Sequence, residues 1–312
     1  MRLLSFDIEC SQVYKGYSPI CNFGYVLYDE KFELIEKKDL VINPRAKFKL
    51  EGRKNQADIK LSYTEKEYKD SKAFPYFYNE IKKILENDNQ LILNHAVIND
   101  LIYLNNECGR YKLPIFNFEA YDTMDLYRAL NNFNGSLSLE KVYEQFCGDK
   151  GFNQHKADED ANAAMKFFIK ICKLLEVKPN ELITMSSIKK YYSNLEKNNK
   201  SNKVTRKTLS DAKVIQIGND FKDKKISISF SIQKDIKKYE SVLYSVKQLG
   251  GEVTLSVSDS NIFIYDENNH CKRCDSYIYN LEHGNSIIGY DYNDYMRFVS
   301  GLLKNALIKN LS

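Results

Sequence analysis

The chain has 312 residues, of which 43% are apolar and 28% charged, and its formal net charge is +4. These proportions exclude wholesale disorder, and the length favours two domains because single cores rarely grow beyond about 250–300 residues. A charge at position 7 leaves no apolar signal-peptide core, and no uncharged apolar run reaches the roughly 18 residues of a membrane span. Seven scattered cysteines indicate reduced thiols, so we expect a cytoplasmic protein without membrane contact.

The excess charge lies in one short segment. Residues 1–178 have a net charge of −1, residues 179–213 a net charge of +5, and residues 214–312 no net charge. Within the middle segment, Asn198–Lys207 is polar, basic and without apolar periodicity, so it buries too little apolar surface to offset its ordering entropy. We therefore predict a domain over 1–178, a basic polar linker over 179–213 and a second domain over 214–312. The linker is either a solvated spacer or a phosphate-contacting segment.

In the first domain, strand patterns precede alternating helices. Alternation predicts a strand over Arg2–Glu9 with Asp7 and Glu9 on the same face. A 3.6-residue apolar period predicts an amphipathic helix over Asp158–Leu175. The other predicted elements are strands at Asn22–Tyr28, Leu34–Asn43 and Gln90–Asn94, and helices that begin near Tyr76 and Asn99. This order is typical of an α/β domain with a mixed sheet.

The pattern restarts after the linker. A strand is predicted over Lys225–Ile232, and a helix over Asp235–Leu249 that Gly250 and Gly251 terminate. The remaining predictions are strands at Glu252–Leu255, Asn261–Tyr265 and Ser286–Ile288, and a helix at Asp291–Leu303. About 100 residues in this order make a small second α/β domain.

Four carboxylates are placed at the ends of these elements. Asp7 and Glu9 lie two residues apart on a strand, so their carboxylates project about 6–7 Å apart from one face. Asp100 and Asp160 lie at predicted helix starts, where an acid can simply stabilise the helix N-terminus through the helix dipole. His155 precedes Asp160 in a loop. Together, the four acids suit a pair of hard divalent cations, and the histidine suits a general base at neutral pH.

Three motifs carry a family resemblance over residues 1–175. Phe6–Glu9, His95 with Asp100, and His155 with Asp160 resemble, in order, the motifs of the DEDD-type 3′–5′ exonucleases. The His-x4-Asp spacing is similar to the histidine-containing DEDDh branch, including the proofreading epsilon subunits of bacterial DNA polymerase III. The resemblance implies a ribonuclease H-like, mixed-sheet α/β exonuclease domain.

The resemblance also implies roles for individual residues. Two Mg²⁺ or Mn²⁺ ions would be bound, His155 would be the general base, and nucleoside 5′-monophosphates would be released from a 3′ end. Cys10, which stands where the family commonly has Thr, and His95 would contact the substrate. The implied metal ligands are Asp7, Glu9, Asp100 and Asp160.

Residues 217–303 resemble a BRCT domain. The matching features include Leu249–Val253, the Val257-Ser258 pair before a predicted strand, and Tyr295 near the family's aromatic position. The resemblance implies docking to a protein partner or to DNA ends. Phosphate recognition is not expected, because Phe230 stands where phosphate-binding members have glycine.

A single Cys-x-x-Cys lies in the second domain. Cys271 and Cys274, flanked by His270 and His283, are compatible with a zinc site, but a structural zinc ion needs four converging ligands. Packed or solvated thiols are the more common outcome for one such pair.

The sequence therefore predicts a metal-dependent 3′–5′ exonuclease acting on single-stranded or 3′-terminal nucleic acid, with DNA favoured and a role in DNA repair or replication. Two alternatives stay open. Because the two-metal reaction does not depend on the 2′-hydroxyl group of the substrate, an exoribonuclease would share the motifs. The departures at Cys10, Ala96 and Asn99 also suit a non-catalytic binding scaffold with a BRCT docking module.

Overall fold

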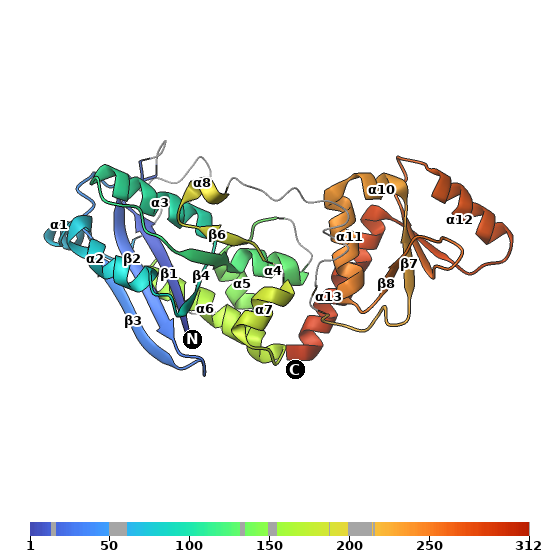
Figure 1. Cartoon of the computed structure of the whole chain (residues 1–312), viewed down its shortest axis with the longest axis horizontal. Helices are drawn as coiled ribbons and strands as arrows, with labels where there is room; N and C mark the ends of the chain where they lie inside the picture. The colour runs from blue at the N-terminus through green and yellow to red at the C-terminus, as the bar shows by residue number, and fades with distance from the viewer. Residues whose placement is uncertain are drawn as a thin grey trace. The chain divides into compact units, whose positions relative to one another are not determined.

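The computed structural model describes residues 1–13, 17–49, 61–131, 135–148, 155–186, 188–198, 214 and 216–311. The chain divides into two units, each considered by itself (Figure 1). The first comprises Met1–Leu126, Ser136–Lys173 and Ile188–Lys200; the second comprises Tyr127–Gly135, Leu174–Ser187 and Ser201–Ser312. Residues 199–213 lie outside the described residues, so the linker predicted there stays a prediction. None of the described helices is long and apolar enough to cross a membrane.

The first unit contains a six-stranded mixed sheet with the order β3-β2-β1-β4-β5-β6. β2 is antiparallel to both of its neighbours, β1 and β3; β4 and β5 run parallel to β1, and β6 is antiparallel to β5. The predicted α/β class with a mixed sheet is thereby confirmed. The strands are β1 (Arg2–Cys10), β2 (Ile20–Tyr28), β3 (Leu34–Val41), β4 (Gln90–Asn94), β5 (Glu119–Asp122) and β6 (Lys190–Tyr192).

β1 separates an apolar face from an acidic one. Phe6 is fully buried, and its ring stacks on Phe23 of β2 with the centroids 5.6 Å apart. Asp7 and Glu9 lie on the opposite face, as the alternation predicts. The register with β2 shifts between Glu9 and Cys10, and such an irregularity bends a strand locally.

Helices connect the strands along residues 61–198 (Figure 1). The predicted helices near Tyr76 and Asn99 are α2 and α3, and the predicted helix at Asp158 is α6. The helices are α1 (Glu65–Asp70), α2 (Phe74–Leu85), α3 (Val97–Arg110), α4 (Thr123–Asn131), α5 (Leu139–Cys147), α6 (Ala157–Leu174), α7 (Pro179–Ser186) and α8 (Leu195–Asn198).

Within the first part of the expected linker, residues 179–186 and 188–198 contain α7, β6 and α8, which differs from the unstructured segment expected there. β6 extends the sheet beside β5, and Lys190 pairs with Glu119 at 2.7 Å. Ser193 fixes the chain next to it, because its Oγ donates to the Phe116 carbonyl at 2.7 Å and accepts from the Phe118 N–H at 2.9 Å. Three residues of strand carry too little periodicity to be recognised in a sequence.

The second unit contains a four-stranded parallel sheet with the order β10-β9-β7-β8. β7 ends at Ile228, before the predicted end at Ile232, because the Ser229 hydroxyl accepts the Ile232 N–H at 3.5 Å and starts a short helix. The last strand, β10, begins at Ile288, whereas its predicted start was Ser286. The elements are β7 (Lys225–Ile228), α10 (Phe230–Lys234), α11 (Ile236–Gln248), β8 (Glu252–Thr254), β9 (Ile262–Tyr265), α12 (Lys272–Glu282), β10 (Ile288–Asp291) and α13 (Tyr292–Leu311).

Candidate metal centre

Asp7, Glu9 and Asp160 come together on the acidic face of β1. One carboxylate oxygen from each lies within 4.8 Å of the others. Asp7 and Glu9 project from β1, and Asp160 comes from the first turn of α6, about 150 residues later. Within the described part of the chain, this is the one group of three or more acidic, histidine or cysteine side chains close enough to share a metal ion. Carboxylate oxygens are the ligands that Mg²⁺ and Mn²⁺ prefer.

Asp100 lies beside this group but is held by its own partner. It is in the first turn of α3 and only 5% exposed, and the Asn94 side chain donates to its Oδ2 at 2.6 Å. The charge of Asp100 raises the pKa of Asp7, so the two carboxylates are close enough to interact. Asp100 is not one of the three acids whose oxygens lie within 4.8 Å of one another, so its role as a metal ligand stays a prediction. Asn94, at the end of β4, orients its carboxylate.

The carboxyl groups of Asp7, Asp100 and Asp160 have raised pKa values. Burial, and then the charges of Asp100, Asp160 and Glu9, hold the pKa of Asp7 well above its usual range. Burial and the Glu9 charge raise the pKa of Asp160 to about 7, and burial raises that of Asp100. Like charges crowded in a desolvated place favour protonation unless a cation neutralises them. The donor set and its electrostatics therefore fit divalent cations.

His155 lies at the edge of the acidic group. Its Nδ1 is 3.5 Å from Glu9 Oε1, and the side chain is 47% exposed. The hydrogen bond with Glu9 raises the pKa of His155. Its backbone is in the left-handed region, with φ 62°, and its carbonyl accepts from the Ser62 hydroxyl at 2.9 Å. The imidazole is thus held next to the carboxylates while water can reach it.

Gly24 allows the start of α6 to approach the sheet. It pairs with Asp7 across β1 and β2, and directly opposed residues point to the same face of a sheet. A Cβ atom at Gly24 would lie 2.0 Å from the Asp158 nitrogen and 2.1 Å from the Ala157 carbonyl carbon. Only glycine fits there, and the close approach brings Asp160 to the face that carries Asp7. A glycine inside a strand pattern is the sequence signal for such an approach.

Asp122 organises the start of α3. Its carboxylate accepts the backbone N–H groups of Ala96 at 2.9 Å, Val97 at 3.1 Å and Met124 at 2.8 Å. Ala96 has φ 60° and no side chain that could cap the helix, so Asp122 from β5 provides the cap. The sequence pattern contains Asp122-Thr123-Met124-Asp125 but does not reveal this role, because the contact joins elements 25 residues apart.

The two predicted substrate contacts have partners inside the protein. The His95 ring nitrogens lie 3.0 Å from Thr123 Oγ1 and 3.1 Å from the Leu137 carbonyl, so Nε2 donates to the carbonyl. Cys10 is 8% exposed, and its thiol donates to the Ser18 carbonyl at 3.6 Å. A role of either residue at the substrate stays a prediction.

The zinc alternative gains no support. His270, Cys271, Cys274 and His283 do not form a metal-sized group among the residues that the structure describes. His270 pairs with Asp275 at 2.6 Å, and the His283 ring stacks on Tyr279.

No protein-family model and no curated protein matches the chain. Similar solved structures include a full-length 3′-exonuclease, with 14% identity, a TM-score of 0.42 and coverage of 55% of this chain and 60% of that one. E. coli exonuclease I in complex with a dT13 oligonucleotide has 18% identity, a TM-score of 0.42 and coverage of 55% and 41%. The nuclease domain of 3′hExo, a DEDDh family member bound to rAMP, has 14% identity, a TM-score of 0.40 and coverage of 55% and 90%. The match spans less than two thirds of the first two chains.

Proposed function

We propose that this protein is a metal-dependent 3′–5′ exonuclease that releases nucleoside 5′-monophosphates from nucleic-acid 3′ ends, with DNA favoured. The observation that carries the proposal is the convergence of Asp7, Glu9 and Asp160, whose oxygens lie within 4.8 Å of one another. Two further observations support the proposal: His155 Nδ1 lies 3.5 Å from Glu9 Oε1, and the Asp100 charge adds to the burial that raises the pKa of Asp7. The mixed six-stranded sheet also suits the ribonuclease H-like architecture that the motifs imply.

The four carboxylates are the residues that would hold two Mg²⁺ or Mn²⁺ ions. When bound, the cations supply positive charge to the phosphodiester oxygens and make a nearby water more acidic. Burial, and then the charges of neighbouring acids, raise the pKa values of Asp7 and Asp160, so a cation would be favoured at these residues. Asn94 contributes by fixing the Asp100 carboxylate in one orientation.

His155 is the residue proposed to accept a proton from the attacking water. Its ring is half exposed, and the Nδ1 atom faces Glu9, which leaves Nε2 for the water. The Glu9 carboxylate favours the imidazolium that results, because its hydrogen bond raises the pKa of His155. Glu9 therefore both orients the base and stabilises its charged form.

Incubation of a 3′-labelled single strand with the protein tests this function. We expect mononucleotides in the presence of Mg²⁺ or Mn²⁺, no cleavage in EDTA, and a loss of about a thousandfold in the Asp7→Ala variant. The Asp70→Ala variant, in which an exposed acid on α1 is removed, is the matched control and should cleave at the wild-type rate. Strand binding without cleavage under every metal condition would instead support the scaffold alternative.

The preference for DNA depends on contacts outside the metal centre. Matched DNA and RNA strands of one sequence should be trimmed at different rates if neighbouring side chains contact the 2′ position. Faster trimming of the RNA strand would replace the DNA assignment with the exoribonuclease alternative and would leave the hydrolytic mechanism unchanged.

We also infer that residues 217–303 are a BRCT-like docking module. Two observations support this inference: the four strands are parallel, and Tyr295 at the family's aromatic position is fully buried. Its ring stacks on Phe221 at 6.4 Å, and its hydroxyl lies 3.0 Å from Ser245 Oγ. Binding of the Asp7→Ala protein to blunt DNA ends in EDTA would indicate an end-binding role. Its absence would leave docking to a protein as the role of the module.

A further inference from the structure

Two thiols meet at the start of α12, in the second unit. Cys271 is the N-cap residue of this helix and Cys274 lies in its first turn, with the Sγ atoms 3.6 Å apart. Residues three apart at a helix start lie on one side of the helix. A disulfide needs an S–S distance of about 2.0 Å, so the sulfur atoms must move closer together for the bond to form.

The two thiols differ in chemical character. Cys271 is partly exposed, whereas Cys274 is 7% exposed. Burial opposes ionisation of Cys271, but the backbone N–H groups of Cys274, Phe230 and Arg273 lower its pKa below the ordinary value. Burial raises the pKa of Cys274 to about 11. One sulfur is therefore suited to attack as a thiolate while the other keeps its proton.

A buried cation stands beside this pair. The Arg273 side chain is only 9% exposed, its Nη1 donates to the Ile228 carbonyl at 2.6 Å, and its guanidinium lies 4.2 Å from the centre of the Phe230 ring. These contacts hold the charge in place at the helix N-terminus. A fixed cation and a helix N-terminus are the surroundings that make a cysteine reactive.

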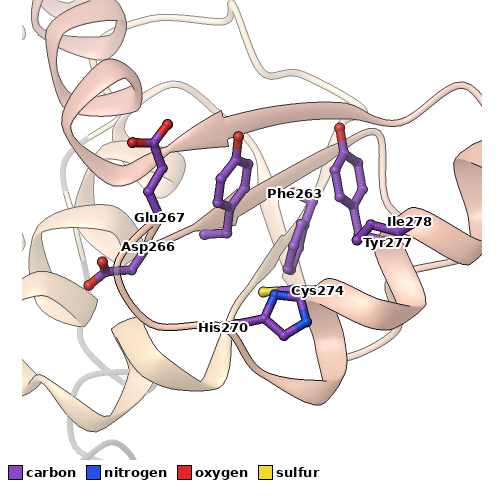
Figure 2. Close-up of a pocket in the computed structure, with 8 residues that line it drawn as sticks. Phe263, Asp266, Glu267, His270, Cys274, Tyr277 and Ile278 are labelled. Carbon is purple, nitrogen blue, oxygen red and sulfur yellow. The ribbon is translucent and has the colours of Figure 1, made fainter.

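Cys274 also lines a pocket of about 300 Å³. Figure 2 shows the pocket, with Cys274 next to His270, Phe263 and Tyr277. Cys274 therefore borders a cavity on one side, although it is otherwise buried in a hydrophobic cluster.

We propose that Cys271 and Cys274 form a redox-active dithiol that exchanges with low-molecular-weight disulfides, such as glutathione disulfide, and closes into an intramolecular disulfide. The Cys271 thiolate attacks one sulfur of glutathione disulfide, forming a mixed disulfide and releasing one glutathione thiolate, which takes up a proton. Cys274 then loses its proton, its sulfur attacks Cys271 Sγ, and the second glutathione leaves as a thiol. Two protein thiols are oxidised, and one glutathione disulfide is reduced to two glutathione molecules. This proposal is independent of the proposed nuclease activity.

Mass spectrometry of the full-length protein tests the dithiol. The reduced protein, in EDTA, is exposed to glutathione disulfide and then alkylated. The wild type should lose two hydrogens, retain no glutathione on this pair and yield a linked Cys271–Cys274 peptide. The Cys274→Ser variant should instead stop at the mixed disulfide on Cys271. The Cys147→Ser variant, which removes the other partly exposed cysteine, should behave as the wild type at this pair.

The rate of alkylation gives a second measurement, which needs no variant. At neutral pH, iodoacetamide should modify Cys271 roughly tenfold faster than Cys147 in the wild type, because only the thiolate reacts. Equal rates for both residues, a stable mixed disulfide in the wild type, or an unmodified pair after prolonged exposure would each overturn the proposal.

Discussion

Gly24 shows how a missing side chain allows a proposed metal ligand to reach the candidate site. The backbone of Ala157 and Asp158 occupies the space that a side chain at Gly24 would need. Since that backbone starts the helix that carries Asp160, any outward movement of α6 separates Asp160 from Asp7. The geometry of the metal centre is therefore sensitive to one methyl group on a neighbouring strand.

We predict that Gly24→Ala lowers exonuclease activity by about a hundredfold, because a shift of about 1 Å at a catalytic group has effects of that size. Overpacking should also reduce the free energy of unfolding by about 1–3 kcal/mol. Gly109→Ala is the matched control: a Cβ there meets nothing within 4 Å, so activity and stability should be retained. Wild-type activity of Gly24→Ala under saturating Mg²⁺ would contradict this account of Gly24.

Glu107 is a buried acid outside the metal centre. It is 1% exposed and pairs with Arg110 at 3.1 Å, yet burial raises its pKa from 4.5 to about 7. The folded protein therefore holds this proton more tightly than the unfolded chain does. By linkage, its contribution to stability is present at low pH and is lost as the pH rises from 4.5 to about 7.

We expect Glu107→Gln to remove this loss. Between pH 5 and pH 8, the free energy of unfolding should fall by about 2 kcal/mol more in the wild type than in Glu107→Gln. Urea unfolding followed by circular dichroism measures it, since the chain has no tryptophan to report by fluorescence. The same substitution at the exposed Glu33 is the control, and an unaltered pH dependence in Glu107→Gln would refute the assignment.

At the scale of elements, the start of α3 depends on a neighbouring strand. Three backbone N–H groups around it share the carboxylate of Asp122, which is 4% exposed. Burial raises the pKa of Asp122 to about 6, although these N–H groups lower it, so at neutral pH it is available as an acceptor. The helix start that holds Asp100 is thereby connected to β5.

Asp122→Ala should leave those N–H groups without their acceptor and destabilise the protein by about 2–4 kcal/mol. It should also reduce activity, since Asp100 loses its fixed position. Asp122→Asn keeps one acceptor oxygen and should recover part of both losses. Thermal unfolding and the labelled-strand assay measure the two effects. If Asp122→Ala and Asp122→Asn were as stable as the wild type, the capping role of Asp122 would be excluded.

At the scale of the whole molecule, the net charge of +4 comes from one segment. Residues 179–213 carry +5, while the parts on either side are near neutral, so the charge is not spread over a basic nucleic-acid-binding surface. A near-neutral nuclease would bind its polyanion mainly through cations, backbone donors and stacking. The basic segment would add an electrostatic tether for long strands.

Neutralising that segment tests the tether. Replacement of its basic residues by glutamine should weaken binding to long strands several-fold and flatten its salt dependence, with trimming of very short strands nearly unchanged. The residues are Lys200, Lys203, Arg206 and Lys207. Rates measured on strands of increasing length check this, and an equal loss on short and long strands would place the segment at the active site instead.

Local patterns in the sequence were sufficient for much of the fold. Alternation predicted β1 with Asp7 and Glu9 on one face, and 3.6-residue periodicity predicted α6. Short elements such as β6 and α10 were not recognised, because three to five residues carry almost no periodic signal. For α10, a serine cap ended a strand that the apolar pattern would have continued.

The sequence by itself determined which acids and which histidine are the candidates for the site, since their order and spacing carry the motif. Only the tertiary structure decided that Asp160 reaches Asp7 and Glu9, that Gly24 makes room for it, and that Asp122 caps the helix of Asp100. The physical reason is the difference in distance along the chain between local patterns and tertiary contacts. A local period reports which face a side chain occupies, whereas contacts between distant segments depend on how complete elements pack.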